Sequence, residues 1–448
     1  LGMKNAQKVN FQSGTTTFNK KSNKKLKVAT FTSWDHKGAG NGSQWRVAAL
    51  RKNGVDAQIF SLMVKSSNNY VERIVPRMCK NFNQNQVWEE VRKRAIFKAK
   101  NTSGYCANEL FSLHDSVLDF RNLKDIFNRN DIIHLHWVVG MLDYDNIGEI
   151  LKDKPVVWTL ADMNAFTGGC HYSEGCKGYT MAYECKECPL LGGSNLAHET
   201  WKYKKKAYEK LNNLHIVCPS SWLAERVKES SLLGDKPVHV IPNAFPIDKF
   251  IPVNQTVARI KLGLPLKKHL ILFGADSLKN ARKGSDLFER IIREYHSKYK
   301  TDNVEVVVFG SNNLQQELPL PIHKLGYLSG ESQLSLVYSA ADVYVLPSRE
   351  DNAPLTVGES LLCGTPVAAF PVGNVPDLVE HKRTGYIAKY LDCTDMVDGI
   401  LWTIHGMRQE KPITMTNRCR QSAVNFHHPD FAAKKYIELY YKMLSYGK

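Results

Sequence analysis

Apolar and polar positions alternate along most of the chain in a way that predicts strands separated by helices. The apolar run 26–33 predicts a buried strand, 38–42 a glycine-rich loop and 43–53 a helix. Further strands are expected within 55–62, 131–137, 155–163, 215–230 and 237–245, with helices at 86–100 and in the second half of 215–230. Strands that alternate with helices form parallel sheets with covered faces.

The same pattern restarts after residue 246. A strand, a basic loop and a helix are expected within 267–295, and further strands within 304–310, 341–348 and 365–370. A short helix is expected at 354–363, because proline suits its first position and Gly364 the position just past its end. The segment 430–446 predicts an amphipathic helix that packs back on the first domain.

The expected fold class is α/β, with two doubly wound, Rossmann-like domains facing each other across a cleft. We divide the chain into a basic, flexible arm (1–25), a first domain (26–245) with a four-cysteine insert (166–192), a second domain (246–425) and a crossing helix (426–448). Ligands of such sheets bind beyond the carboxyl ends of the strands.

Composition is that of a globular protein, with 43% hydrophobic and 23% charged residues among 448. The formal net charge of +16 favours a polyanionic partner such as an anionic membrane face or a phosphorylated substrate, although a solubilising surface is the alternative. A nucleic-acid partner is disfavoured, because no basic stretch is interleaved with aromatic residues. No apolar run reaches the ~20 residues of a membrane span, and no signal peptide is evident, so we expect a cytoplasmic protein.

Two carboxylates flank the beginning of the 354–363 helix. Asp351 precedes this helix and Glu359 lies about one turn inside it. Carboxylates bind hydroxyl groups, and a helix N-terminus attracts an anion such as phosphate. This combination predicts a site for a sugar nucleotide.

Two loops at strand ends offer further contacts to such a ligand. Gly38 and Gly40 would let the backbone approach it closely, although a tight turn would need the same residues. Arg282 and Lys283 lie where a diphosphate would approach the second domain, after the strand that contains Gly274. The alternative for this basic loop is a solvated run of charges.

The segments "LPSREDNAPLTVGESLLCGTPVAAF" (346–370) and "GNVPDLVEHKRTGYIA" (373–388) resemble the nucleotide-binding domain of glycosyltransferase family 4, retaining enzymes of GT-B fold. The segments "DIIHLHW", "WTLADMNAFTGGCHY" and "ARKG" are similar to its colanic-acid and capsule-type branch. The resemblance implies transfer of a hexose from a UDP- or GDP-sugar to a lipid-linked saccharide in surface polysaccharide biosynthesis, without a catalytic metal. The protein would work peripherally at the inner, anionic face of the membrane.

The resemblance also implies roles for individual residues. Glu359 would hold the ribose and Asp351, as the first acid of an E-x7-E motif, the donor sugar. Lys283 with Arg282 would neutralise the diphosphate, and Gly38 and Gly40 would let the first domain close over the donor. The expected donor contacts are completed by Gly274, Asn352 and the backbone amides of Leu355 and Thr356.

Three positions depart from the family pattern. The first acid is Asp351 instead of Glu, and Pro354 replaces a usual Gly. Ala161 stands where the family has a catalytic histidine, and alanine can neither move a proton nor donate a hydrogen bond. Ala161 is an engineered substitution, a natural loss, or a position whose role Asp162 or His134 takes over. The alternative function is a catalytically impaired or inactive binder of sugar nucleotides or glycans.

Four cysteines cluster as C-x5-C-x8-C-x2-C. Four thiolates at such spacings indicate a structural zinc site; reduced thiols and a redox or iron–sulfur role are the alternatives. His171 is a possible substitute ligand. The expected metal ligands are Cys170, Cys176, Cys185 and Cys188, and we expect no catalytic role for them.

His134 and His136 alternate on one strand and so share one face of the sheet. No third ligand accompanies them, so a metal pair is disfavoured. We expect both to line the acceptor side of the cleft.

Overall fold

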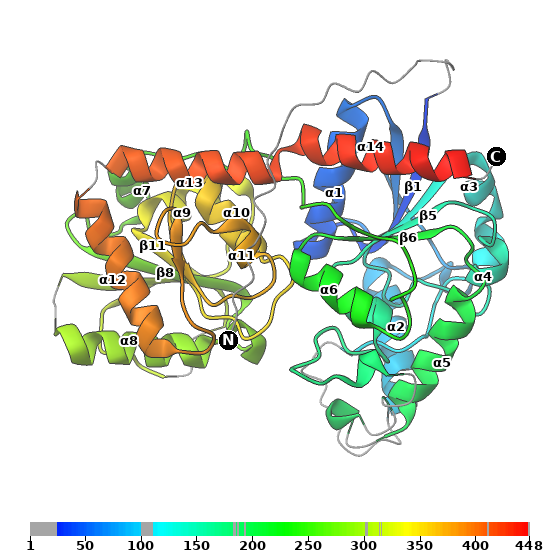
Figure 1. The fold of residues 1–448 in the computed structure, drawn as a ribbon, viewed down its shortest axis with the longest axis horizontal. Helices are drawn as coiled ribbons and strands as arrows, with labels where there is room; N and C mark the ends of the chain where they lie inside the picture. The colour runs from blue at the N-terminus through cyan, green and yellow to red at the C-terminus, as the bar shows by residue number, and fades with distance from the viewer. Residues whose placement is uncertain are drawn as a thin grey trace.

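The structure is a computed structural model that describes residues 25–99, 111–181, 185, 188–191, 194–300, 303–312, 314, 316–409 and 412–446. It contains two parallel sheets side by side, each covered by helices (Figure 1). The predicted fold class of two doubly wound α/β domains is confirmed. Residues 1–24 of the expected basic arm lie outside the described residues.

The first sheet has seven strands in the order β3-β2-β1-β4-β5-β6-β7, all paired in parallel. Its strands are β1 (Lys27–Trp34), β2 (Asp56–Met63), β3 (Val71–Arg73), β4 (Ile132–Leu135), β5 (Val156–Thr159), β6 (Leu214–Cys218) and β7 (Val238–Val240). Its helices are α1 (Lys37–Lys52), α2 (Gln84–Ala99), α3 (Lys124–Arg129), α4 (Ile147–Ile150), α5 (Leu196–Tyr208) and α6 (Ser221–Glu229). Short 3₁₀ turns lie at η1 (Arg77–Cys79), η2 (Phe120–Leu123), η3 (Asn164–Phe166), η4 (Gly178–Thr180) and η6 (Pro189–Leu191).

The second sheet has six parallel strands in the order β10-β9-β8-β11-β12-β13. They are β8 (His269–Ser277), β9 (Val304–Ser311), β10 (Ile322–Lys324), β11 (Val343–Leu346), β12 (Val367–Ala369) and β13 (Gly385–Ile387). The helices are α7 (Gln255–Leu262), the 3₁₀ turn η7 (Ala281–Lys283), α8 (Ser285–Tyr299), α9 (Glu331–Ala340), α10 (Leu355–Leu362), α11 (Val375–Leu378), α12 (Cys393–Gln409) and α13 (Pro412–His427).

Each sheet reverses its strand order once, at β1/β4 in the first and at β8/β11 in the second. At such a switch point the loops leave the sheet in opposite directions and open a crevice at the carboxyl ends of the strands. The four-residue strands β4 and β11 are buried throughout, as expected for the middle of a covered parallel sheet. The fold therefore predicts ligand sites after β1, β4, β8 and β11.

The predicted glycine loop 38–42 is wrong in one respect, because helix α1 already begins at Lys37. Gly38, Gly40 and Gly42 thus lie in the first two turns of the helix. A Cβ at Gly40 would stand 2.5 Å from the carbonyl carbon of Asp35 and 2.7 Å from the Trp34 oxygen. Gly40 is therefore needed for α1 to start directly against the end of β1.

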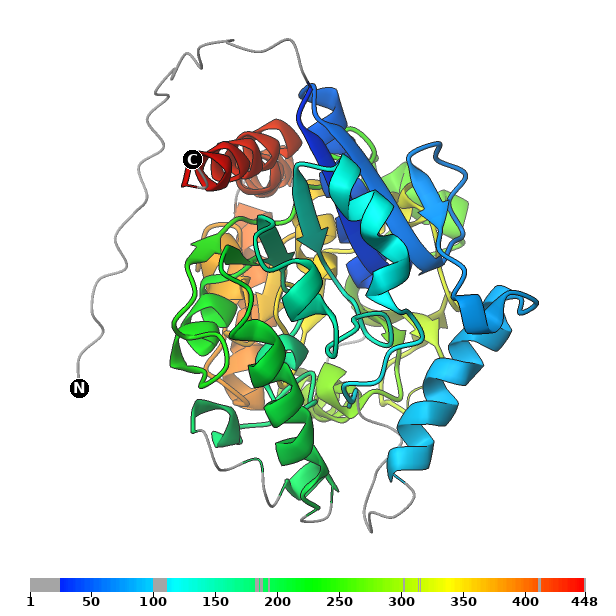
Figure 2. The same cartoon turned by 90° about the vertical axis from the view of Figure 1, so that its right-hand side faces the viewer.

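Two helices in line join the domains along one edge of the molecule (Figure 1). Helix α13 packs against α10 of the second domain, and α14 (Pro429–Tyr446) packs against α1 of the first. Figure 2 shows α14 in red beside the blue strands of the first sheet, where Tyr436, Tyr440 and Met443 join the core that contains Val28 and Val47.

The chain crosses between the domains twice, and the two crossings are bonded to each other. The Phe245 amide donates to the His427 carbonyl (3.1 Å), and the His427 ring Nδ1 lies 2.8 Å from the Asn243 carbonyl. Arg420 of α13 ties the first crossing further, since its guanidinium donates to the carbonyls of Ile247 and Phe250.

Candidate active site

A cleft of about 1700 Å³ lies between the domains at the carboxyl ends of β1, β4, β8 and β11. All the predicted donor-site residues line it, as do three of the positions expected on the first-domain side. These lining residues are Gly38, Gly40, His136, Ala161, Asp162, Gly274, Arg282, Lys283, Asp351, Asn352, Leu355, Thr356 and Glu359.

A cluster of opposite charges forms the floor of the cleft on the second-domain side. The Lys283 ammonium lies 2.6 Å from Asp351 Oδ2, and Arg282 Nη1 lies 3.2 Å from the same oxygen. The two cations come from η7 after β8, and the carboxylate from the loop after β11, so the switch point brings them together. Two positive charges face one carboxylate, which leaves capacity for an anion.

Burial alone would raise the pKa of Asp351, but Lys283 and Arg282 together lower it below its ordinary value. The pKa of Lys283 is also lowered, first by burial and further by Arg282, while Asp351 opposes this only in part. Asp351 is therefore ionised at neutral pH.

Helix α10 brings Glu359 to the cleft one turn from its N-terminus. Pro354 is the N-cap of this helix instead of its first residue, and its side chain accepts no hydrogen bond from the first turn, which includes the amides of Leu355 and Thr356. Glu359 accepts a hydrogen bond from the Tyr338 hydroxyl (2.9 Å) and is only 7% exposed. Burial raises its pKa to about 7 despite this hydrogen bond.

Asn352 links the two domains across the bottom of the cleft. Its side-chain amide donates to the Ala161 carbonyl (2.9 Å), and its Oδ1 accepts from the Ser220 hydroxyl (2.7 Å). The side chain is buried, and its partners all belong to the first domain. Asn352 therefore holds the first domain beside the Lys283–Asp351 pair.

Asp162 is fixed by three partners beside Ala161. Its Oδ2 lies 2.6 Å from His171 Nδ1 and accepts from Trp137 Nε1 (3.0 Å), while Oδ1 accepts from the Asn164 amide. Burial would raise the pKa of Asp162, but His171 and the other donors lower it overall. An ionised carboxylate with both oxygens occupied is poorly suited to replace the missing histidine as a proton acceptor.

The expectation that both strand histidines line the cleft is half wrong. His136 lines it, where its Nε2 lies 2.9 Å from the Ala39 carbonyl. His134 is completely buried under α14, with its ring nitrogens 2.6 Å from the Tyr440 hydroxyl and 2.8 Å from the Thr159 hydroxyl. The two histidines lie on the same face of the sheet, but helix α14 covers His134. His134 can therefore neither contact an acceptor nor replace the histidine expected at position 161.

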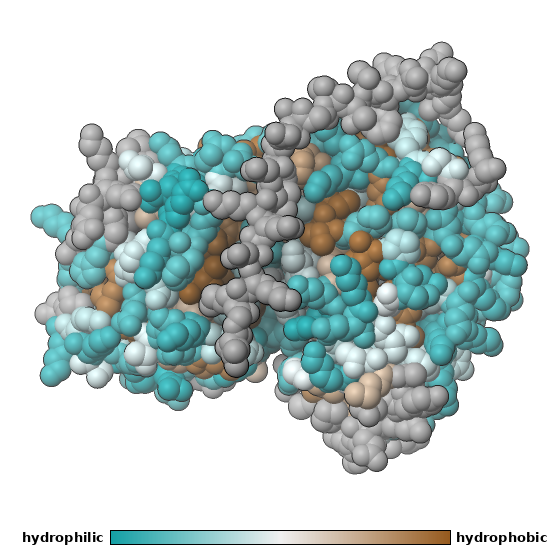
Figure 3. Space-filling view, in the orientation of Figure 1, coloured by the Kyte–Doolittle hydropathy of each residue, from teal (hydrophilic) through white to brown (hydrophobic). Residues whose placement is uncertain are grey.

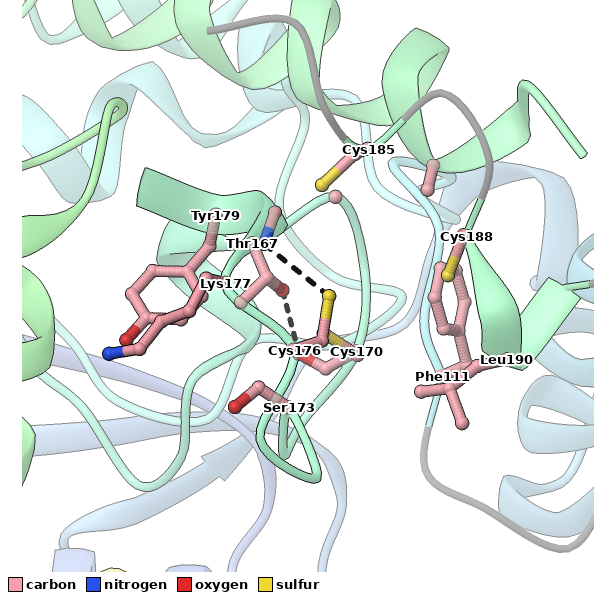
Figure 4. A pocket seen from close by; sticks show the side chains of 13 residues that line it. Phe111, Thr167, Cys170, Ser173, Cys176, Lys177, Tyr179, Cys185, Cys188 and Leu190 are labelled. Carbon is pink, nitrogen blue, oxygen red and sulfur yellow. Dashed lines mark hydrogen bonds between the residues drawn. The ribbon is translucent and has the colours of Figure 1, made fainter. Parts of the chain in front are cut away.

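The four clustered cysteines line a second cavity of about 180 Å³, in the insert of the first domain (Figure 4). Among the described residues, no three His, Cys, Asp or Glu side chains lie close enough together to hold a metal ion. His171 does not line this cavity; its Nε2 lies 2.8 Å from the Ser112 hydroxyl and its Nδ1 contacts Asp162. His171 as a substitute ligand is therefore wrong, because both ring nitrogens are occupied.

Two residues that contact the charged side chains of the cleft were not predicted from the sequence. Tyr338 binds Glu359 from helix α9, and the Tyr172 ring lies over the Arg282 guanidinium, 4.0 Å from its Cζ. Both contacts join segments that are far apart in the chain. No local pattern signals them.

A protein-family model described as "Glycosyl transferases group 1" matches residues 267–405. The chain is 25% identical over 254 residues to the "Putative colanic acid biosynthesis glycosyl transferase WcaC" of Escherichia coli K12, covering 53% of this chain and 58% of that one. It is 27% identical over 319 residues to a "D-inositol 3-phosphate glycosyltransferase" of Mycobacterium sp. strain JLS, covering 66% of this chain and 63% of that one. The matches thus span less than two thirds of either relative.

Solved structures extend the likeness to the whole fold. Sucrose-phosphate synthase from Thermosynechococcus elongatus superposes with a TM-score of 0.63 at 16% identity, covering 94% of this chain and 100% of that one. Anabaena HepE, solved in complex with UDP-glucose, superposes with a TM-score of 0.57 at 13% identity, covering 92% and 99%. Residues 267–405 thus match the group 1 glycosyl transferases, and the two facing parallel-sheet domains have the GT-B fold.

Proposed function

We propose that the protein transfers a hexose from a nucleotide-diphosphate sugar to a saccharide acceptor, with retention at the anomeric carbon. The observation that carries this proposal is the convergence of Lys283, Arg282 and Asp351 at the beginning of α10. Glu359 lies one turn further along α10, and we assign it to the ribose. HepE, a structural neighbour, was solved with UDP-glucose.

In this proposal the bond between the anomeric carbon and the diphosphate oxygen breaks while the acceptor oxygen bonds to the same face. Negative charge grows on the departing diphosphate, where Lys283, Arg282 and the backbone amides of Leu355 and Thr356 stabilise it. The leaving phosphate takes the proton of the acceptor hydroxyl, so no side chain has to remove it. Asp351 orients the sugar hydroxyls, and Asp162 anchors the loop that carries Ala161.

The first-domain wall of the cleft suits a saccharide acceptor. Trp34, Trp88 and Trp137 line it, with the rings of Trp34 and Trp88 at 4.7 Å between centroids and those of Trp88 and Trp137 at 6.2 Å. Aromatic faces with a few polar groups are typical of sites that bind the apolar faces of small ligands. His136 lies on the same wall.

We assign the acceptor to the lipid-linked class and the protein to the anionic, cytoplasmic face of a membrane, in surface polysaccharide biosynthesis. The support is the net charge of +16 and the likeness to a colanic-acid glycosyltransferase. Among the described residues, no helix is both long and apolar enough to cross a bilayer. Hydrophilic residues prevail on the face drawn in Figure 3, outside the grey atoms.

A second function, binding of a sugar nucleotide without turnover, is favoured by Ala161 alone. Its methyl group lines the cleft where the resemblance predicts a histidine. The donor site would remain intact in this alternative, so donor binding cannot separate the two functions; turnover can.

We also propose that Cys170, Cys176, Cys185 and Cys188 bind a structural zinc ion, which would have to draw these side chains together, because no three of them lie close enough in the described structure to hold a metal ion. Backbone amides point at three of the sulfur atoms: that of Gly178 at Cys176 (3.4 Å), that of Gly168 at Cys185, and those of Leu190 and Leu191 at Cys188. Burial raises the pKa of Cys185 and of Cys188, and these amides oppose that effect only in part, so a bound metal ion would be needed to hold the cysteines as thiolates. The buried Lys204 ammonium adds positive charge beside Cys170 and Cys185.

Calorimetric titration of UDP and GDP tests the donor site, with Glu359→Ala as the variant and the surface variant Glu380→Ala as its control. We expect one of the two nucleotides to bind at micromolar concentration, and Glu359→Ala alone to lose the binding. If neither nucleotide binds the wild-type protein, the donor-site assignment is wrong and only the fold remains.

A further inference from the structure

The cysteine insert of the first domain reaches the charge cluster of the second domain at one point. The Tyr172 ring covers the Arg282 guanidinium at 4.0 Å, and two residues further on the Glu174 amide donates to Glu350 Oε2 (2.9 Å). Arg282 Nη1 in turn donates to the Glu350 carbonyl (2.7 Å). Residues 172–174, which we call the clasp, thus contact both Arg282 and its neighbour Glu350.

Residues of the first domain fix the position of the clasp. His171, the residue before Tyr172, is completely buried, and its ring nitrogens contact Asp162 (2.6 Å) and Ser112 (2.8 Å). Ser173 lines the cysteine cavity, and Cys170 and Cys176 flank the clasp on either side. The position of the Tyr172 ring is therefore set by the first domain, independently of any ligand.

The Tyr172 ring occupies the face of the Arg282 guanidinium, while hydrogen bonds form at its edge, where Nη1 donates to the Glu350 carbonyl and lies 3.2 Å from Asp351 Oδ2. The planar guanidinium stacks through its face, while its N–H groups point outward in the plane, where they match the oxygens of a phosphate. Arginine otherwise loses side-chain freedom when it is ordered by a ligand. A ring that already fixes the plane removes part of that cost before binding.

We propose that Tyr172 is a positioning residue for donor binding, which orients Arg282 toward the diphosphate and thereby makes donor affinity depend on the first domain. This proposal rests on the proposed function, because it takes Arg282 as a diphosphate ligand. If Tyr172 has this role, the second domain alone does not form the complete donor site. The site is complete only when the cysteine insert of the first domain lies against Arg282.

Titrations of UDP and of uridine test the proposal on three variants of the full chain. Tyr172→Leu removes the ring system, Tyr172→Phe keeps it, and Tyr203→Leu changes an exposed tyrosine of α5 outside the cleft. We expect Tyr172→Leu to raise the Kd for UDP about tenfold or more, and Tyr172→Phe and Tyr203→Leu to change it by less than about threefold. Uridine has no phosphate, so its Kd, followed by ligand-observed NMR, should be the same in all four proteins; GDP and guanosine replace this pair if the site takes guanine.

Equal losses for UDP and uridine in Tyr172→Leu would assign Tyr172 a merely structural role, and an unchanged Kd for UDP would overturn the proposal outright. Either result, obtained while the wild-type protein binds UDP, leaves the proposed function standing. Absence of nucleotide binding in the wild-type protein removes both. Thermal unfolding of each variant shows whether a lost affinity reflects a lost fold.

Discussion

The Lys283 ammonium and the Asp351 carboxylate lie 2.6 Å apart in the cleft, although 68 residues separate them in the chain. Arg282 shares the same carboxylate oxygen at 3.2 Å. In the free protein the carboxylate thus holds the cations that a diphosphate would need. A bound diphosphate has to compete with Asp351 for Lys283, so the two residues should affect nucleotide binding in opposite directions.

Lys283→Met and Asp351→Asn test this opposition. We expect Lys283→Met to weaken UDP or GDP binding and to lower turnover about 100-fold or more, because it removes charge from the leaving group. We expect Asp351→Asn to keep or tighten nucleotide binding while it lowers turnover. Lys279→Met, on the exposed part of the same loop, is the control. Weaker nucleotide binding in Asp351→Asn would contradict the competition.

Glu359 should make the stability of the protein depend on pH. Burial raises its folded pKa to about 7, above the ordinary 4.5, so its contribution to stability is full below about pH 4.5 and is lost as the pH rises through 7. The difference reaches about 3 kcal/mol in the free energy of unfolding. Urea unfolding of wild type and Glu359→Gln at pH 5 to 8 measures it, and we expect the wild type to lose stability relative to the variant. Parallel curves would show that Glu359 ionises normally.

Nucleotide binding should also change the protonation of Glu359. Ribose hydroxyls donate to an ionised carboxylate, so nucleotide binding should favour the charged form of Glu359 and release a proton near pH 6. Calorimetry in two buffers with different ionisation enthalpies counts that proton. Glu359→Gln should release none.

Substitution of Ala161 tests whether the protein is an active enzyme or a binder without turnover. We expect Ala161→His to raise turnover of the donor while the Kd for the nucleotide changes by less than about threefold, since Ala161 contributes its carbonyl to Asn352 and not to the diphosphate. Ala161→Gln supplies a hydrogen-bond donor without a titratable group and so distinguishes hydrogen bonding from proton transfer. If wild type already turns over at the rate of Ala161→His, the histidine is dispensable in this chain.

The cysteine cavity should carry one zinc ion per chain. Metal analysis of protein purified without chelators should find zinc in the wild type and in Cys393→Ala, a cysteine of the second domain, but not in Cys185→Ser or Cys188→Ser. Because zinc binds only the folded site, its removal should lower the melting temperature. Zinc-free wild-type protein whose four thiols react freely with a thiol reagent would leave the cluster as ordinary reduced cysteines.

The sequence predicted the elements that depend on local pattern. Parallel strands, the short helix α10 and the αL glycine Gly364 that ends it all follow from apolar spacing and turn chemistry within about ten residues. The same local pattern misplaced the beginning of α1, because the requirement for Gly40 comes from the end of β1 and not from a loop. The roles of His134 and Tyr172 depend on what packs against them, α14 in one case and the second domain in the other.

The sequence predicted which charged loops share a site, but not which side chains contact each other there. A basic loop and an acidic loop at neighbouring strand ends indicated that Lys283 and Asp351 serve one site, since the switch point brings such loops together. The bond from the Asn164 amide to Asp162 is local, but the contacts of Asp162 with His171 and Trp137 could not be read from spacing, because they depend on how the chain folds between these residues. The consequence for Asp162 as a proton acceptor therefore needed the structure.

The bonded pair of crossings at Asn243–Phe245 and His427 determines how the cleft can open. Because hydrogen bonds join the two connecting segments, neither segment can rotate independently of the other. Opening would then be a rotation about these two crossings, and it would have to break the contacts that bridge the cleft, among them that of Tyr172 with Arg282 and that of Asn352 with Ala161. The rates of donor entry and release would then depend on how easily these bridging contacts separate.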